Sequence, residues 1–252
     1  MLDRFDPARL RPAVIVALLV GLVAGLTSAL LLSVTGEPLV RAAIAIERAR
    51  DAATGHGGAD PELVSRSVQS GPGLFAALGL SGAVFGVLFA LAFWGLRHAQ
   101  PEPFRRSLWA GAILFGSLTL APWVKYPPNP PAVGDPATLG RRQALYVSLI
   151  ALSLALSLLG AALAGRLHRD GWPEHRRVPA VAAAVALAFG LALALLPPAP
   201  DPVDAPATLV WRFRLASLGG NAVLWGVLTV GFGLLAAEAA RRRSRSLVAV
   251  SV

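Results

Sequence analysis

Long apolar runs alternate with short polar segments along the whole chain. Six of these runs approach or exceed the roughly 20 helical residues that cross the hydrocarbon core of a bilayer. None of the charged residues falls inside them, although Asp, Glu, Lys and Arg make up 15% of the chain. This segregation predicts an all-α, polytopic integral membrane helix bundle that forms one transmembrane domain over residues 1–252. The predicted spans are 13–34, 73–96, 107–123, 144–164, 178–196 and 215–237.

Two of the predicted spans have alternatives. The third, 107–123, is the shortest and contains a proline at its end, so it is either a full span or a buried or re-entrant helix. The first, 13–34, could be a signal peptide, but its apolar run exceeds the roughly 7–15 residues of such a region. No clear small-residue cleavage site follows it either. We therefore expect an uncleaved first span.

The distribution of basic residues predicts the orientation of the spans. With the N-terminus inside, the segments on the cytoplasmic side carry a clear excess of arginine, whereas the opposite loops are nearly balanced in charge. Cytoplasmic loops of membrane proteins carry this excess, so both termini are expected in the cytoplasm. The spans then pair into three hairpins joined by proline-bearing outer loops. Those outer loops are 35–72, 124–143 and 197–214.

The basic composition bears on whether the chain binds nucleic acid or anionic lipid. The net charge is +9 and the pI is about 11.5, values that could indicate nucleic-acid binding. The basic tail Arg241–Arg245 directly follows an apolar span, however, and this position is typical of an electrostatic anchor to anionic lipid. The lipid bilayer is therefore the expected partner, and nucleic acid is not.

The outer loops contain an internal similarity. Pro136-Ala137-Thr138-Leu139 recurs as Pro206-Ala207-Thr208-Leu209, and arginines follow each copy. Proline suits the first turn of a helix, where its missing N–H is not needed. The similarity indicates either a repeated hairpin unit or one good helix start that occurs twice by chance.

Proline and amphipathic patterns predict the conformation of two outer segments. Six prolines lie between Pro122 and Pro136, and we expect this stretch to be neither helix nor strand but polyproline II. The segment Pro38–Ala53 has apolar positions at helical spacing. It is either an amphipathic helix on the membrane surface or an extension of the first span.

Several classes of chemistry are excluded or unsupported. The chain has no cysteine, which excludes disulfides, thiolate metal sites and cysteine nucleophiles. It contains no zinc-protease, serine-hydrolase or phosphate-loop motif, so we do not expect an enzyme. The four histidines, His56, His98, His168 and His175, all lie in predicted loops without ligand-like spacing, and each is expected to be a solvated loop residue.

Polar groups inside the predicted spans are few and uncharged. Asn221 is the best candidate for a functional intramembrane polar group, with a structural bond between helices as the alternative. Ser148, Ser153 and Ser157 are expected to bond back to carbonyls of their own helix.

The outer loops hold the remaining candidate residues. Glu37, Glu47 and Asp135, near Tyr126 and Asn129, could capture a hydrated cation. Basic residues at the same level would repel it, and we expect the acids and bases to pair with one another. The predicted outer-face set comprises Glu37, Glu47, Arg66, Gln69, Lys125, Tyr126, Asn129, Asp135, Arg141, Arg142 and Arg214.

Short motifs spread from residue 36 to residue 218 resemble one family. The motifs that carry the resemblance are Gly36-Glu37-Pro38-Leu39, Ala45-Ile46-Glu47, Val64-Ser65-Arg66 with Gln69, Lys125-Tyr126-Pro127-Pro128-Asn129-Pro130-Pro131, Gly134-Asp135-Pro136 and Phe213-Arg214-Leu215-Ala216-Ser217-Leu218. On these motifs the chain resembles the CbtA-type cobalt transporter subunits, bacterial integral membrane proteins.

The resemblance implies a function that the residues alone do not. It implies Co²⁺ uptake linked to vitamin B12 synthesis, in the cytoplasmic membrane of a bacterium. Cobalt would be the substrate rather than a permanently bound cofactor, and a small membrane partner subunit is consistent with the family's name. The alternatives are a non-transporting membrane scaffold or assembly protein and a transporter of a different small ligand.

Overall fold

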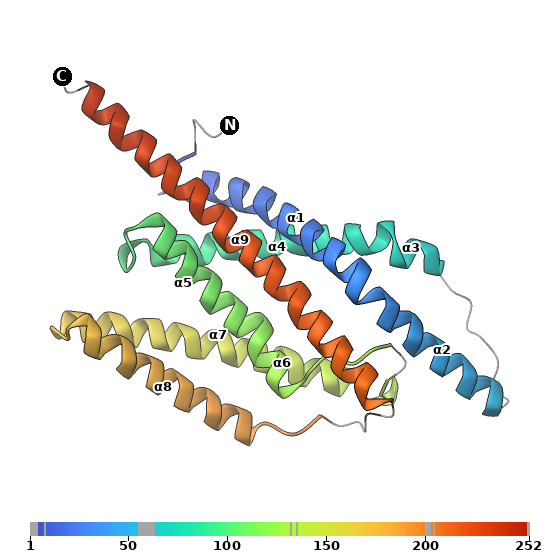
Figure 1. The fold of residues 1–252 in the computed structure, drawn as a ribbon. Coiled ribbons are helices and arrows are strands. Elements are labelled where there is room, and N and C mark those ends of the chain that lie inside the picture. The colour runs from blue at the N-terminus through green and yellow to red at the C-terminus, as the bar shows by residue number, and fades with distance from the viewer. Residues whose placement is uncertain are drawn as a thin grey trace. The chain divides into compact units, whose positions relative to one another are not determined.

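The structure is a computed structural model that describes residues 5–7, 9–54, 64–131, 133–134, 136–199, 203 and 205–250. These residues form helices and turns without any strand. The helices are α1 (Leu10–Thr35), α2 (Glu37–Thr54), α3 (Arg66–Ser70), α4 (Pro72–Gly95), α5 (Pro103–Phe115), α6 (Ala121–Lys125), α7 (Leu139–Arg169), α8 (Glu174–Leu195) and α9 (Ala207–Val250) (Figure 1).

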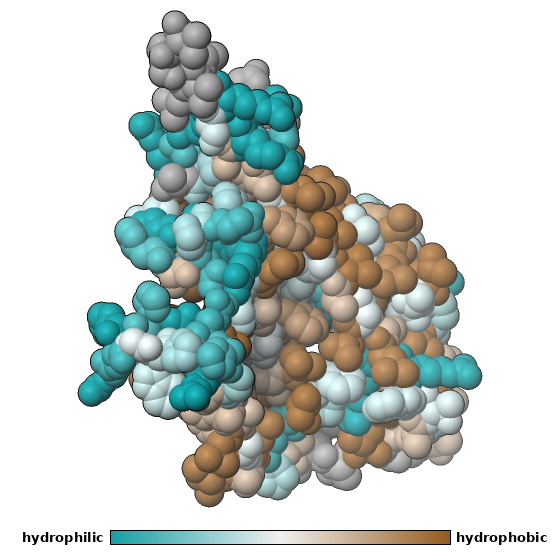
Figure 2. All heavy atoms as spheres, turned by 60° about the vertical axis from the view of Figure 1, so that its left-hand side comes forward, coloured by the Kyte–Doolittle hydropathy of each residue, from teal (hydrophilic) through white to brown (hydrophobic). Residues whose placement is uncertain are grey.

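Six helices are long and apolar enough to cross a membrane, which confirms the predicted fold class. Each extends beyond the predicted apolar run at one or both ends, because polar residues end the membrane crossing without ending the helix. Arg241–Arg245, for example, lie within α9, and arginine is a good helix former. The third crossing is one helical stretch, Pro103–Lys125. Apolar side chains cover much of the face in Figure 2, as expected of a chain surrounded by lipid.

The chain divides into two compact units, which we describe separately. Unit 1 comprises residues 1–112, 129–133 and 205–252, and unit 2 comprises residues 113–128 and 134–204. The prediction of one transmembrane domain stays a prediction.

In unit 1, α1 packs closely against α4 and α9 (Figure 1). The contact with α4 depends on glycines: a Cβ atom added at Gly21 would lie 2.1 Å from the carbonyl oxygen of Gly82. The reverse substitution meets the same obstacle, because a Cβ at Gly82 would lie 2.1 Å from the carbonyl oxygen of Gly21. Burial of apolar surface does not drive helix association in lipid, so this backbone approach supplies the van der Waals contact instead.

An aromatic cluster closes one end of unit 1. Phe232 of α9 is fully buried and meets Phe89 and Phe93 of α4 edge-on, at centroid distances of 5.3 and 4.9 Å. Phe5, which precedes α1, also meets this ring edge-on, at a centroid distance of 5.8 Å. Beside it, the Asp6 carboxylate pairs with Arg243 at 2.6 Å, so the N-terminal segment is fastened to α9.

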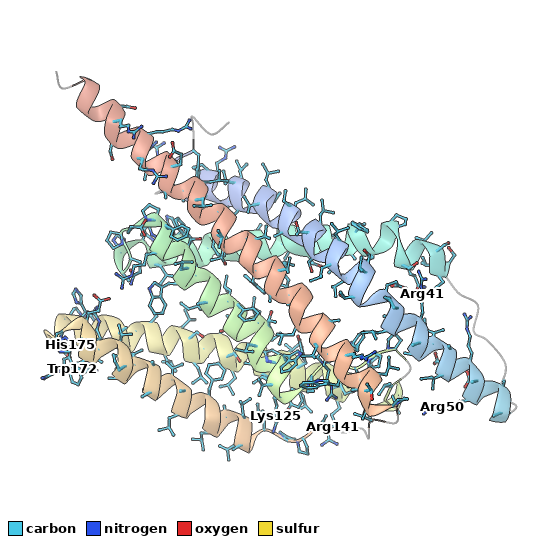
Figure 3. All side chains as sticks on the ribbon, in the orientation of Figure 1. Arg41, Arg50, Lys125, Arg141, Trp172 and His175 are labelled. Carbon is cyan, nitrogen blue, oxygen red and sulfur yellow. The ribbon has the colours of Figure 1, made fainter. Side chains whose placement is uncertain are left out.

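Unit 2 is built on the α7–α8 hairpin. The hairpin turns at Gly171, whose φ of 80° is in the left-handed region that glycine adopts readily. The amides of Gly171 and Trp172 donate to the carbonyls of His168 and Leu167, which completes a Schellman motif at the end of α7. Trp172 and His175 lie at this turn (Figure 3).

The third crossing helix contains a π-helical turn, Gly116–Leu120, between α5 and α6. The expectation that Pro122 begins a non-helical stretch is wrong, since Pro122 lies in the first turn of α6. The π-helical turn changes the hydrogen-bonding register just before this proline, so the missing N–H is tolerated as it is at a helix start. Residues 127–130 have no regular structure.

The structure bears on two alternatives that the sequence left open, the conformation of segment Pro38–Ala53 and the similarity of the two Pro-Ala-Thr-Leu copies. The amphipathic segment forms α2, a separate helix that begins directly after Gly36 at the end of α1. The two Pro-Ala-Thr-Leu copies begin helices differently. Pro136–Thr138 is a 3-10 turn before α7, whereas α9 begins at Ala207, with the Val210 amide donating to the Pro206 carbonyl at 3.1 Å.

Candidate functional site

Glu37 and Arg66 form an ion pair in unit 1. Glu37 is the first residue of α2 and is buried, and Arg66 begins α3. Arg66 also donates to the Gln69 side chain at 3.2 Å, and the Gln69 amide donates to the Val64 carbonyl at 2.8 Å. Arg41, one turn along α2, brings its Nε within 3.6 Å of the Glu37 carboxylate. Two guanidinium groups therefore neutralise Glu37.

Asn129 and Arg214 meet elsewhere in unit 1. The Arg214 guanidinium donates to the Asn129 side-chain oxygen at 2.8 Å. This bond attaches the short segment 129–133 to α9, and the neighbouring Pro130 is fully buried. Asn129 thus acts as a structural acceptor in this arrangement.

In unit 2, the end of α6 is fastened to the end of α8. The Lys125 ammonium donates to the Leu193 carbonyl at 2.7 Å, and the Tyr126 hydroxyl donates to the Pro197 carbonyl at 2.9 Å. Burial raises the pKa of Tyr126 above its ordinary value. Both side chains satisfy carbonyls near a helix C-terminus, where a cation is favoured by the helix dipole.

The other predicted outer-face residues lie elsewhere in the structure or outside the described residues. Glu47 is exposed on α2, and Arg141 is exposed in the first turn of α7 (Figure 3). Arg142 is half-buried next to it. Asp135 lies outside the described residues, as does His56. Among the residues that the structure describes, no group of three His, Asp or Glu side chains could hold a metal ion.

Most polar side chains within the crossing helices of unit 1 have structural partners. The Asn221 amide donates to the Ser217 carbonyl of its own helix at 2.9 Å. Ser28 and Ser107 instead donate between helices, to the carbonyls of Gly220 at 2.8 Å and Thr229 at 2.6 Å. In the part of the chain that the structure describes, the candidate Asn221 therefore bonds back to its own helix and not to a neighbouring one.

Three serines of unit 2, Ser117, Ser153 and Ser157, lie together, whereas the sequence predicted only back-bonding within the helix for Ser153 and Ser157. Ser117 lies in the π-helical turn and shares a hydrogen bond of 2.8 Å with Ser157 of α7. Ser117 Oγ also lies 3.4 Å from the Ser153 carbonyl. The expected back-bonding of Ser153 is not found, because its buried hydroxyl has no hydrogen-bond partner among the described residues. The available signal was the four-residue spacing of Ser153 and Ser157, which places both on one face of α7.

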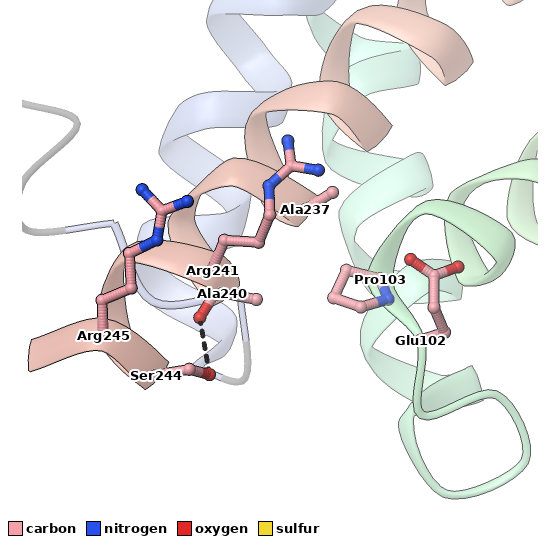
Figure 4. Close-up of a pocket in the computed structure, with 7 residues that line it drawn as sticks. All are labelled: Glu102, Pro103, Ala237, Ala240, Arg241, Ser244 and Arg245. Atoms are coloured by element: carbon pink, nitrogen blue, oxygen red, sulfur yellow. Dashed lines mark hydrogen bonds between the residues drawn. The ribbon is translucent and has the colours of Figure 1, made fainter. Parts of the chain in front are cut away.

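A groove in unit 1 lies between the start of α5 and the basic end of α9 (Figure 4). It has a volume of about 410 Å³ and is lined by Glu102, Pro103, Ala237, Ala240, Arg241, Ser244 and Arg245. The Glu102 carboxylate accepts from the amides of Phe104 at 2.9 Å and Arg105 at 2.5 Å, so it caps α5. Arg241 pairs with Glu238 at 3.1 Å. Glu102 therefore stabilises the start of α5, and Arg241 pairs within its own helix.

Comparison with known proteins identifies the chain. The family model described as "Probable cobalt transporter subunit (CbtA)" matches residues 10–237. The chain belongs to the CbtA family. No curated protein and no solved structure matches it.

Membership in the CbtA family, together with the six long apolar helices, establishes what kind of protein contains these side-chain contacts. The chain is a multi-pass membrane protein of a cobalt transporter subunit family. The segment Lys125–Pro131, one of those that carry the resemblance to this family, contains the residues that bond the end of α6 to the end of α8 and Asn129 to α9. The motif around Glu37 and Arg66 contains the ion pair in unit 1. In this structure Glu37, Lys125 and Asn129, which belong to these segments, bond to groups of other segments of the chain.

Proposed function

We propose that the chain is the membrane-embedded part of a cobalt uptake system and carries Co²⁺ without chemically modifying a substrate. The observation that carries the proposal is the family match, which extends over residues 10–237 and includes most of all six long apolar helices. Membership in a family of transporter subunits also supports a non-enzymatic role. The word "subunit" supports a second membrane protein as partner.

Water and protein oxygen atoms are the expected surroundings of the ion along its path. Co²⁺ accepts imidazole, carboxylate, carbonyl and water ligands. Within the described residues no group of three His, Asp or Glu side chains could replace its hydration shell. We therefore propose that the ion crosses with part of its water shell, in contact with hydroxyl and carbonyl oxygens.

Glu37 is the acid that we propose meets the ion first. Its carboxylate is held by Arg66 and Arg41, and its side chain is only 10% exposed. A carboxylate held in this way is unavailable to a cation until an arginine moves aside, so the pair would act as a closed entry. Glu47 lies on the same helix and is exposed, which makes it a matched control.

Uptake by cells tests the proposal. A bacterial strain without its own cobalt importers would express the chain, alone or with its partner subunit, and accumulation of radiolabelled Co²⁺ would be measured. We expect accumulation above the empty-vector level, a reduced rate for Glu37→Gln and an unchanged rate for Glu47→Gln. Equal accumulation with and without the chain would refute transport and favour the scaffold alternative.

We also propose that both chain ends lie in the cytoplasm, because arginines are concentrated on that side of the predicted spans. The chain has no cysteine, so single cysteines can report on accessibility. In intact cells, a membrane-impermeant maleimide should label Val133→Cys and should not label Gln100→Cys. The opposite labelling pattern would contradict the proposed orientation.

A further inference from the structure

The serine cluster of unit 2, defined as Ser117, Ser153 and Ser157, is a concentration of polar groups within two crossing helices. Ser117 belongs to the stretch Pro103–Lys125, and the other two belong to α7. Ser117 and Ser153 are fully buried. Polar side chains at membrane depth are costly and commonly mark the path of a substrate or ion.

The hydroxyl of Ser153 is the unusual member. A serine in a helix ordinarily donates to a carbonyl of the preceding turn, as Ser81 does to Ala77 at 2.7 Å. Ser153 Oγ is buried and makes no hydrogen bond within the described part of the chain. A buried hydroxyl without a partner costs about 1–3 kcal/mol and calls for an unseen water or ion.

The buried serines of unit 1 provide a contrast. Ser28 and Ser107 are as buried as Ser153, but each donates to a carbonyl of a neighbouring helix. Their hydroxyls are accounted for by helix packing. Burial of a serine between helices therefore does not by itself leave the hydroxyl without a partner in this protein.

The backbone next to the cluster is also irregular. Ser117 lies in the π-helical turn Gly116–Leu120, and such turns occur frequently at functional sites. A π-helical turn moves amide donors away from their usual carbonyl acceptors, so it makes backbone oxygen atoms available. Hydroxyl and carbonyl oxygens then lie together where α7 meets this turn, as the 3.4 Å separation of Ser117 Oγ and the Ser153 carbonyl shows.

We propose that the serine cluster binds the hydration shell of a divalent cation on its way across the membrane. This inference rests on the proposed function and deepens it. Water molecules bound to the ion donate to the serine and backbone oxygens, and Ser153 supplies the free hydroxyl. Neutral oxygens suit this role, because a transport site must attract an ion without retaining it.

Water access to Ser153 is the first test, and the absence of cysteine from the chain makes it direct. Ser153→Cys and Ser28→Cys would each be treated, in membranes, with a small cationic methanethiosulfonate. A thiol surrounded by lipid or packed side chains does not react, whereas one that meets water does. We expect modification of Ser153→Cys, slowed by Co²⁺ in the medium, and none of Ser28→Cys. Equal resistance of the two variants would overturn the proposal.

Transport by alanine variants is the second test, and it separates the two levels of inference. In vesicles, Ser153→Ala should slow Co²⁺ entry about tenfold, the effect of losing one hydrogen bond to a charged hydrate, whereas Ser28→Ala should not slow it. If the wild-type chain carries cobalt and Ser153→Ala carries it equally fast, only the serine cluster is refuted. If the wild-type chain carries none, either alone or with its partner subunit, the proposed function fails and the inference fails with it.

Discussion

Unit 1 buries its crossing helices against one another, whereas unit 2 leaves most of its helix surface exposed. In unit 1, α1 alone buries eight residues, from Ala13 to Ala29, against its neighbours. In unit 2, α8 has no buried residue, although the structure describes all of it. Leu187 and Leu195 on α8 are about three-quarters exposed.

The difference indicates different tasks for the two units. Close glycine contacts, an aromatic cluster and hydroxyl bonds between helices hold unit 1 together, and these are the forces available in lipid. In unit 2 the long helices meet along fewer side chains, and the two bonds of Lys125 and Tyr126 fasten its end. We expect unit 1 to be the rigid part and unit 2 the part that adjusts during transport.

The largest effect should come from the aromatic cluster. Phe232→Ala removes the ring that contacts Phe5, Phe89 and Phe93, and it should lower the free energy of unfolding by about 3–5 kcal/mol. Leu187→Ala in α8 should change that free energy by no more than about 0.5 kcal/mol. Unfolding in detergent micelles titrated with dodecyl sulfate measures both. Similar losses would mean that the two units are equally packed.

A smaller effect should come from the helix contact in unit 1. Gly82→Val places side-chain atoms against the α1 backbone, and overpacking of this kind costs about 1–3 kcal/mol. Gly190→Val in α8 is the matched control, because a Cβ atom at Gly190 meets no atom within 4 Å. We expect thermal aggregation in detergent to begin at a lower temperature for Gly82→Val alone. If Gly82→Val is as stable as the wild type, the close contact of α1 and α4 is refuted.

The smallest effect should be local to unit 2. Lys125→Met removes the bond to the Leu193 carbonyl, a contribution of about 1 kcal/mol for a partly buried charged donor. Hydrogen exchange should accelerate at the end of α8 and stay unchanged in α4. Arg141→Met, which alters an exposed arginine of the same unit, should leave exchange at α8 unchanged. Unaltered exchange in Lys125→Met would show that another contact holds this helix end.

The sequence predicts the crossing helices of both units well, because ionised side chains are excluded from the hydrocarbon core. It predicts helix ends less well. Arg166 and Glu238 end the apolar runs, but arginine and glutamate are both good helix formers, so α7 and α9 extend past them. The π-helical turn and the helical position of Pro122 depend on hydrogen-bond register, which residue types do not determine.

The sequence predicts some contacts of the candidate site and not others. Opposite charges at the predicted outer face indicate pairing, and Glu37 with Arg66 forms such a pair. The partner of a side chain within a span depends instead on how each helix is rotated about its axis. The four-residue spacing of Ser153 and Ser157 places both on one face of α7, but it does not predict that Ser117 is their partner. Residue spacing does not predict either that Asn221 bonds to its own helix.

Cobalt flux through the purified chain tests the central claim most directly. The protein would be reconstituted into lipid vesicles, alone and with its partner subunit, and entry of radiolabelled Co²⁺ would be compared with entry into empty vesicles. The account predicts entry above the empty-vesicle rate in at least one of these preparations. Entry at the empty-vesicle rate in both would contradict it.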